Sequence, residues 1–212
     1  MHPRARSTAP EGYEADAAFA VRLTGRRLDA IARERATVCG LWPDLTIALV
    51  NHAWWRFAEE NGAPPDFAGR FGLGCAMGDG ISGPQRPYYE IALRRVLETG
   101  RPWRHIYRCP SVTLDRTYHL EVIPVGDRRG LLLTHAPQGI VPHADRGDDV
   151  QADPASYLDA RGLLRQCGHC RRVRRVDDPS RWDWVAAWIA AVPRRVSHEL
   201  CRLCLELHYV ES

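Results

Sequence analysis

The chain has 212 residues, a net charge of +3 and no lysine, because all 29 of its basic residues are arginine. This length predicts one ordinary domain and something smaller. No apolar run approaches the roughly 20 residues that cross a bilayer, and there is no secretory signal, so we expect a cytoplasmic protein without a membrane span. The arginine excess is confined to residues 161–212, which contain ten arginines and six carboxylates.

The N-terminal 36 residues are predicted to be a tail followed by one amphipathic helix, with Gly25 as a candidate interruption. Between Tyr13 and about Ala36, apolar residues recur at near-helical intervals among arginines and acids. Because the apolar stripe has no obvious surface to cover, we expect a homodimer formed through residues 13–36. The alternative is that the stripe packs on the chain's own sheet.

Strand and helix signals then follow one another over about 100 residues. Asn51 is a good N-cap, Asn61-Gly62 ends a helix, and Gly126-Asp127 supplies a tight turn. We expect strands near residues 37–42, 45–50, 103–109, 118–125 and 130–135, and helices from Asn51 to Asn61 and from Pro87 to Gly100. This order predicts an α+β fold, with a five-stranded antiparallel sheet and helices on one face.

Two Cys-x-x-Cys pairs, Cys167 with Cys170 and Cys201 with Cys204, lie near the end of the chain. Each such turn brings two sulfurs within reach of one ion, and two turns supply the four tetrahedral ligands that structural zinc prefers. In a chain without a secretory signal, this spacing favours a metal over two disulfides. We therefore predict one structural zinc ion bound by the four thiols, with no open position for catalysis.

The 30 residues between the two pairs predict a small subdomain that resembles a treble clef. We expect a strand at residues 172–176, a helix at 182–192 and a helix capped by Ser197. On the last helix, Leu203, Leu207 and Val210 are expected to face inward. Among the histidines, His198 is the candidate for orienting the site by hydrogen bonding to a ligand, while His169 and His208 are expected to face solvent.

A basic cluster beside the first cysteine pair is a candidate anion contact; it consists of Arg171, Arg172, Arg174 and Arg175. Four arginines converging on one face would favour nucleic acid, whereas pairing with Asp177, Asp178 and Asp183 would favour protein contact. The nearby tryptophans Trp182, Trp184 and Trp188 are interpreted as the core of the small module. The alternative is that an exposed Trp184 anchors a partner.

Residues 37–136 resemble a PAS sensor domain. The resemblance is carried by the hairpin Cys39–Val50 with Asn51-His52-Ala53-Trp54, by the helix Tyr88–Thr99, and by Tyr107-Arg108-Cys109-Pro110-Ser111. The tail, with Ser197-His198-Glu199-Leu200 before its second cysteine pair, is similar to the cysteine module of bacterial PAS and receiver-type signalling proteins. Glu199 stands where that module has glycine. We therefore expect an N-terminal segment 1–36, a PAS-like domain 37–137, a linker 138–160 and a zinc-binding module 161–212.

The resemblance implies a bacterial signalling protein in which the PAS domain senses or docks and the zinc module binds another macromolecule. A PAS fold can enclose a small molecule, and the candidate pocket residues are Trp54, Tyr88, Tyr89 and Trp103, which could equally be plain core. No catalytic pattern is visible, so we expect no enzyme activity. The partner is expected to be another signalling protein, and the alternative is a nucleic-acid-binding regulator. A third hypothesis is a redox switch that releases zinc.

Overall fold

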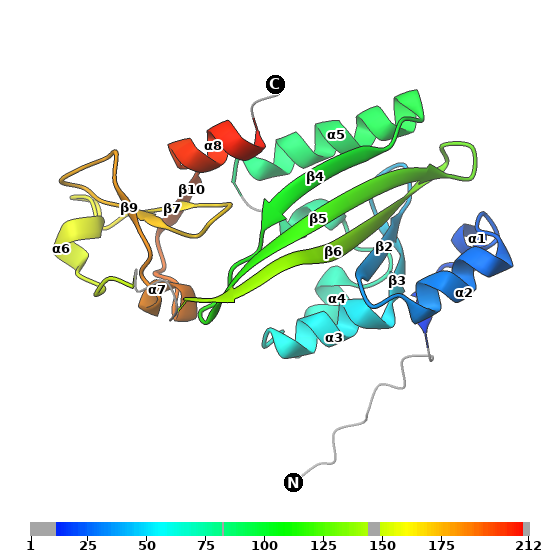
Figure 1. The fold of residues 1–212 in the computed structure, drawn as a ribbon, viewed down its shortest axis with the longest axis horizontal. Helices are drawn as coiled ribbons and strands as arrows, with labels where there is room; N and C mark the ends of the chain where they lie inside the picture. Colours follow the sequence, from blue (N-terminus) through cyan, green and yellow to red (C-terminus); the bar gives the residue numbers. More distant parts are fainter. Residues whose placement is uncertain (1–11, 82, 144–148, 210–212) are drawn as a thin grey trace, which may run out of the picture. The chain divides into compact units, whose positions relative to one another are not determined.

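The computed structural model describes residues 12–81, 83–143 and 149–209. Its larger part is a six-stranded antiparallel sheet with the order β1-β3-β2-β6-β5-β4 (Figure 1). The strands are β1 (Tyr13–Ala15), β2 (Thr37–Leu41), β3 (Ile47–Asn51), β4 (Trp103–Arg108), β5 (Leu114–Val125) and β6 (Gly130–Pro142). The helices are α1 (Ala17–Ala20), α2 (Gly25–Arg33), α3 (His52–Glu60), α4 (Phe67–Phe71), α5 (Gln85–Thr99) and the 3-10 helix η1 (Met77–Gly80).

The tail forms a second, four-stranded sheet with the order β10-β7-β8-β9. Its strands are β7 (Leu164–Cys167), β8 (Val173–Arg174), β9 (Trp182–Asp183) and β10 (Val196–Glu199), and its helices are α6 (Pro154–Tyr157), α7 (Ala187–Ala190) and α8 (Arg202–His208). Strand β10 pairs with β7 in parallel, whereas the β7–β8 and β8–β9 pairs are antiparallel.

The chain divides into two compact units, and neither is one continuous stretch of sequence. The first unit comprises residues 1–80, 92–103 and 121–135, and the second comprises residues 81–91, 104–120 and 136–212. Strands β5 and β6 run through both units. The second unit thus contains the cysteine pairs together with the start of α5, most of β4 and the first half of β5.

The five predicted strands are present, and β1 adds a sixth. The single helix predicted for residues 13–36 is wrong, because β1 pairs with β3 and only the short helices α1 and α2 follow. Asp16 and Thr24 explain the break, since each caps a helix through its side-chain oxygen. Strand pairing by Tyr13–Ala15 thus overrides the helical periodicity of the segment.

Phe19 and its neighbours account for the apolar stripe on which the dimer prediction rested. Phe19 is fully buried in the core of the first unit. The buried members of this cluster are Phe19, Leu23, Ile31, Val38, Ala48, Leu49, Val125 and Leu132. A Cβ on Gly40 or on Gly130 would lie 2.5 or 2.7 Å from the Phe19 ring, so these glycines leave the room that the ring fills. The stripe is therefore covered within the chain, and a dimer through residues 13–36 stays a prediction.

Asn51 confirms its predicted role as the N-cap of α3 and also links the first two central strands. Its Oδ1 accepts hydrogen bonds from the backbone N–H of Trp54 at 3.2 Å and of Val38 at 3.0 Å. Its Nδ2 donates to the carbonyl oxygens of Ala36 at 2.9 Å and Glu34 at 3.3 Å. Because Asn51 is fully buried, these four bonds replace the water that the amide has lost.

Two predicted helices of the tail are wrong. Residues 182–192 form β9 and the four-residue helix α7, because Trp182 and Asp183 pair with β8. Ser197 lies in β10 instead of capping a helix, and α8 begins after Cys201, its N-cap. The strand predicted at residues 172–176 is shorter, at Val173–Arg174. The predicted inward position of Val210 lies outside the described residues.

No helix in the part of the chain that the structure describes is long and apolar enough to cross a membrane.

Substitution of Gly40 by alanine should destabilise the first unit. The added Cβ would lie 2.5 Å from the Phe19 ring and 2.9 Å from the Leu49 Cβ, so the N-terminal segment must shift. We expect a loss of about 1–3 kcal/mol in the free energy of unfolding, measured by urea denaturation. Gly69→Ala is the matched control, because no atom lies within 4 Å of its added Cβ. Equal stabilities of the two variants would contradict this packing.

Candidate metal centre

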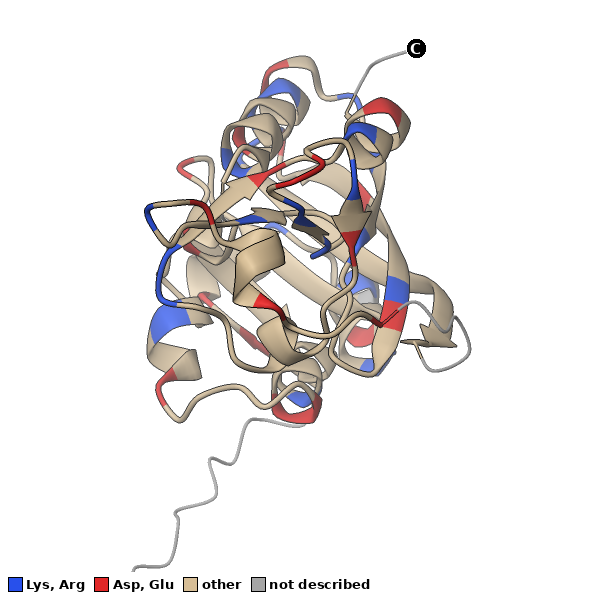
Figure 2. Cartoon of the chain, turned by 90° about the vertical axis from the view of Figure 1, so that its left-hand side faces the viewer, with Lys and Arg blue, Asp and Glu red and all other residues tan. Residues whose placement is uncertain are grey.

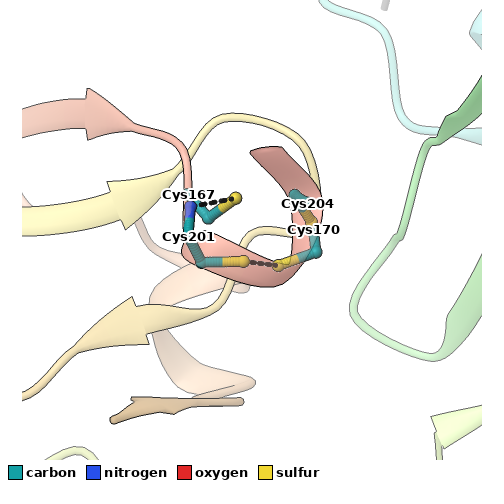
Figure 3. A group of neighbouring side chains, drawn as sticks. All are labelled: Cys167, Cys170, Cys201 and Cys204. Carbon is teal, nitrogen blue, oxygen red and sulfur yellow. Dashed lines mark hydrogen bonds between the residues drawn. The ribbon is translucent and has the colours of Figure 1, made fainter. Parts of the chain in front are cut away.

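The sulfur atoms of Cys167, Cys170, Cys201 and Cys204 all lie within 4.8 Å of one another, and all four residues are buried (Figure 3). The sulfurs of Cys170 and Cys201 are 3.8 Å apart. Four thiols gathered at this distance could hold a metal ion. The predicted grouping of the two pairs into one site therefore agrees with the geometry.

Backbone hydrogen bonds shape the turn that carries the first pair. Cys167 ends β7, where its N–H donates to the Arg172 carbonyl at 2.8 Å and its carbonyl accepts from the Arg171 N–H at 2.9 Å. Arg171 has a φ of 63°, a left-handed conformation that is uncommon for a residue other than glycine. The turn thus reverses the chain between β7 and β8 and directs both sulfurs to the same side.

Parallel pairing of β10 with β7 brings the second pair to the first. Glu199 of β10 is aligned with Cys167, and its carbonyl accepts a hydrogen bond from the Gly168 N–H at 2.8 Å. The Cys201 N–H then donates to the Cys167 sulfur at 3.4 Å. Cys204 lies one turn into α8. The pairing of β7 with β10 sets the distance between the two cysteine pairs. The spacing of the cysteines in the sequence does not predict this strand pairing.

The thiols strongly perturb one another. Hydrogen bonds from Cys170, Cys201 and Cys204 hold the pKa of the Cys167 thiol far below its ordinary value. The same contact with Cys167 raises the pKa of Cys170 and of Cys204. The contact with Cys167 opposes ionisation of Cys201, but hydrogen bonds from Cys170 and Cys204 lower the pKa of Cys201 to about 7. A bound metal ion would favour deprotonation of all four.

His169, between the two cysteines of the first pair, is fully buried, so the prediction that it faces solvent is wrong. Its Nε2 accepts a hydrogen bond from the backbone N–H of Arg108 in β4 at 3.1 Å. Its Nδ1 lies 2.9 Å from the hydroxyl oxygen of Tyr209, which also accepts from Gln85 Nε2 at 2.7 Å. Because Nε2 is the acceptor, the ring proton of neutral His169 must be on Nδ1. Nothing in the sequence distinguishes this histidine from an exposed one.

His208 is half-buried and does not face solvent as predicted. Its ring stacks on that of His169, with centroids 4.2 Å apart and an interplanar angle of 20°. His208 also packs edge-on against His105 of β4, with ring centroids 6.5 Å apart. Two histidines of the cysteine module, from different ends of its sequence, therefore contact the same strand.

Aromatic side chains surround this contact. Tyr88 and Tyr89, two of the predicted pocket residues, lie at the start of α5 and each pack against His105, at 5.4 and 5.5 Å. Tyr88 also packs edge-on against Tyr209 at 4.7 Å. The other two candidates, Trp54 and Trp103, belong to the first unit and are half-buried. The structure therefore does not bring the four into one unit.

His198, the predicted orienting histidine, lies in β10 opposite Gln166 of β7. Its Cβ is 2.6 Å from the position that a Cβ on Gly83 would take, so Gly83 packs closely against it. The next residue, Glu199, has extended backbone within the strand, and the position therefore does not require glycine. Its carboxylate forms ion pairs with Arg165 and with Arg174, the latter at 3.3 Å.

Two of the four arginines in the predicted basic cluster, Arg174 and Arg175, are paired with acids. Arg175 forms a two-pronged pair with Asp177, at 2.6 and 2.8 Å, and lies 3.7 Å from Asp183. Arg174 pairs with Glu199, and Arg172 donates to the Trp182 carbonyl at 3.5 Å. Figure 2 shows basic and acidic residues interspersed. Pairing with Asp177 and Asp183 is the outcome that favours protein contact over nucleic acid.

Trp184 is buried, with 2% of its surface exposed, and stacks on His143 at 3.8 Å, so it is not an exposed anchor. Its core interpretation is correct, and Trp182 and Trp188 also pack against buried clusters of the module. Leu203 and Leu207 of α8 are instead exposed, at 62% and 66%, which contradicts their predicted inward position. The reason is that α8 turns Cys204 and Tyr209 inward, and the leucines lie on other faces of the helix.

No protein-family model and no curated protein matches this chain. Among solved structures, the chain is similar to a domain of an HTR-like protein from Haloarcula marismortui, with 21% identity and a TM-score of 0.37. The similarity covers 50% of this chain and all of that domain. At this TM-score the similarity carries no conclusion about fold or function.

Stability should fall as the pH decreases below about 6.5. Burial lowers the pKa of His169 from 6.5 to about 3, so between these values the unfolded chain binds a proton that the folded chain excludes. The contribution of neutral His169 to the free energy of unfolding is complete above pH 6.5 and is lost as the pH falls towards 3. His169→Gln, which keeps an acceptor and a donor, should show a shallower decline in melting temperature between pH 7 and 5. The exposed His52→Gln is the control, and identical slopes in both variants would contradict this assignment.

Proposed function

We propose that this protein is a bacterial signalling protein. In this proposal a PAS domain senses or docks, and a zinc-bound cysteine module binds another macromolecule. The succession from β2 to β6 is two strands, the short helices α3, α4 and η1, the longer helix α5 and three strands. It supports the PAS part, because it is the succession that the resemblance implies. The proposal is also supported by the mixed α+β fold and by the four-cysteine cluster.

Zinc is the ion that this donor set fits best. Four thiols satisfy the tetrahedral coordination of structural zinc and leave no position for water or substrate. The core beside them is small: its buried residues are Tyr157, Leu164, Val173 and Val185. A module of this size commonly needs a metal to be stable. Zinc bound here would supply folding free energy and no chemistry, so we propose that the protein is not an enzyme.

The observation that carries the signalling proposal is the hydrogen bond from the Arg108 N–H of β4 to His169 of the cysteine turn. A strand of the proposed sensor sheet and the proposed output module share this part-buried contact. A ligand or partner that favours one position of β4 would therefore favour one arrangement of the module, which is a population shift.

The surface proposed for the partner is the outward side of α8. Leu203 and Leu207 are separated by one helical turn and are both more than half exposed. The neighbouring charges are balanced, since Arg202 pairs with Glu206 at 2.6 Å. An apolar pair within a neutral surrounding fits another signalling protein better than the phosphates of a nucleic acid.

Purified full-length protein should contain one zinc ion per chain. Changing any one of the four cysteines of the cluster to serine should remove it, because three thiolates and a hydroxyl hold zinc far more weakly than four thiolates. Native mass spectrometry measures the metal, any retained small molecule and the oligomeric state together. Cys75→Ser is the matched control, since Cys75 lies outside the cluster and donates to the Gly69 carbonyl. Wild-type protein without metal but with a cooperatively folded tail would refute the zinc assignment.

The protein should bind duplex and single-stranded nucleic acid with dissociation constants above the micromolar range at physiological salt. Arg174 pairs with Glu199 and Arg175 with Asp177, which reduces the positive charge available to phosphates. Changing Arg171, Arg172, Arg174 and Arg175 together to alanine should therefore leave the affinity for nucleic acid unchanged. Fluorescence anisotropy at several salt concentrations measures both. Submicromolar binding that the four changes abolish, with a salt slope flattened by up to about 4 units, would favour the nucleic-acid alternative.

A further inference from the structure

Strand β4 lies at the end of the six-stranded sheet, so one side of its backbone has no neighbouring strand in that sheet. Successive residues of a strand direct their backbone groups to opposite sides. The N–H of Cys109, the residue after β4, donates to the Arg116 carbonyl of β5 at 2.9 Å, which places residue 109 on the inner side. Ile106 and Arg108 therefore direct their backbone groups to the outer side.

The cysteine module covers that outer side. His169 accepts from the Arg108 N–H at 3.1 Å, and His208 packs against His105 of β4 with ring centroids 6.5 Å apart. The two imidazole rings stack at 4.2 Å, so they form one unit against the strand. An exposed edge strand is a template for pairing with another chain, and covering the edge prevents such pairing.

Arg108 joins the same strand to the thiol cluster by charge. Its guanidinium forms a two-pronged ion pair with Asp115, which is buried. Burial opposes the charge on Arg108, but Asp115 and then the thiols of Cys170 and Cys204 raise its pKa. A zinc ion with four thiolates has a net charge of about −2, so a neighbouring guanidinium stabilises the loaded site.

From these contacts we propose that metal binding at the cysteines and closure of the β4 edge are coupled. This inference rests on the zinc assignment of the proposed function. Metal holds the turn between Cys167 and Cys170, and the turn holds His169 against Arg108. Loss of the metal releases His169 and exposes the outer backbone of β4. Because coupling is reciprocal, a change at β4 must alter the metal affinity by the same factor.

Amide hydrogen exchange on the full-length protein tests this coupling. Removal of zinc by a chelator should speed exchange of the Arg108 amide by about 10-fold or more, within the roughly 5–150-fold range usual for coupled sites. The Cys109 amide, bonded within the sheet, is the internal control and should keep its protection. His169→Phe should give fast Arg108 exchange with zinc still bound and should weaken zinc affinity by a similar factor. His169→Gln should restore both.

The outcomes separate the two proposals. Failure of the wild-type protein to bind zinc refutes the zinc assignment, whatever the exchange rates. Stoichiometric zinc with an Arg108 amide that exchanges equally fast in the loaded and chelated protein overturns the coupling alone. If the chelated protein also loses protection at Cys109, the zinc-loaded His169→Phe variant decides, because slow exchange at Arg108 in that variant overturns the coupling and fast exchange supports it.

Discussion

Four thiols buried within 4.8 Å of one another are the constraint on which the second unit depends. Like charges this close in a buried site repel one another, so a cation is needed for all four sulfurs to be ionised together. The turn of the first pair, the parallel pairing of β10 with β7 and the start of α8 all serve to bring these atoms together. The apolar core beside them is too small to hold these atoms together by burial alone. Metal binding by the cysteines and the folding free energy of the module are therefore linked.

The second feature is the closure of the sheet at β4. Antiparallel sheets need a means to protect their end strands, and here the His169 imidazole accepts a hydrogen bond from the strand's backbone. This arrangement joins the module to the α5–β4–β5 part of the second unit by directional hydrogen bonds, and the ring packing of Tyr88, Tyr89 and Tyr209 adds apolar area around them. Directional bonds are sensitive to small displacements of either partner. The contact is therefore suited to transmitting a change, whereas an apolar contact alone would tolerate slippage.

Charge pairing has a third role in the tail. Composition makes residues 161–212 basic, yet Glu199 and Asp183 each neutralise two arginines, namely Arg165 with Arg174 and Arg175 with Arg181. Asp183 also accepts a hydrogen bond from the buried Tyr157 at 2.8 Å. These pairs link β7, β8, β9 and β10 across the small sheet. These four arginines therefore contribute to the module's own structure.

The sequence by itself determined the grouping of the four cysteines, the five predicted strands and the N-cap at Asn51, because each rests on local rules: a two-residue spacer, alternating apolar residues and a short amide beside a helix start. For the apolar stripe of residues 13–36, it suggested both a dimer contact and packing on the chain's own sheet. Only the tertiary structure decided that Phe19 fills the room above Gly40 and Gly130, that Val196–Glu199 is a strand, and that His169 is buried. Those features depend on residues far apart in the chain, and periodicity and spacing carry no information about such pairings. The exposed Leu203 and Leu207 show the same limit, since α8 is oriented by Cys204 and Tyr209 and not by its own apolar residues.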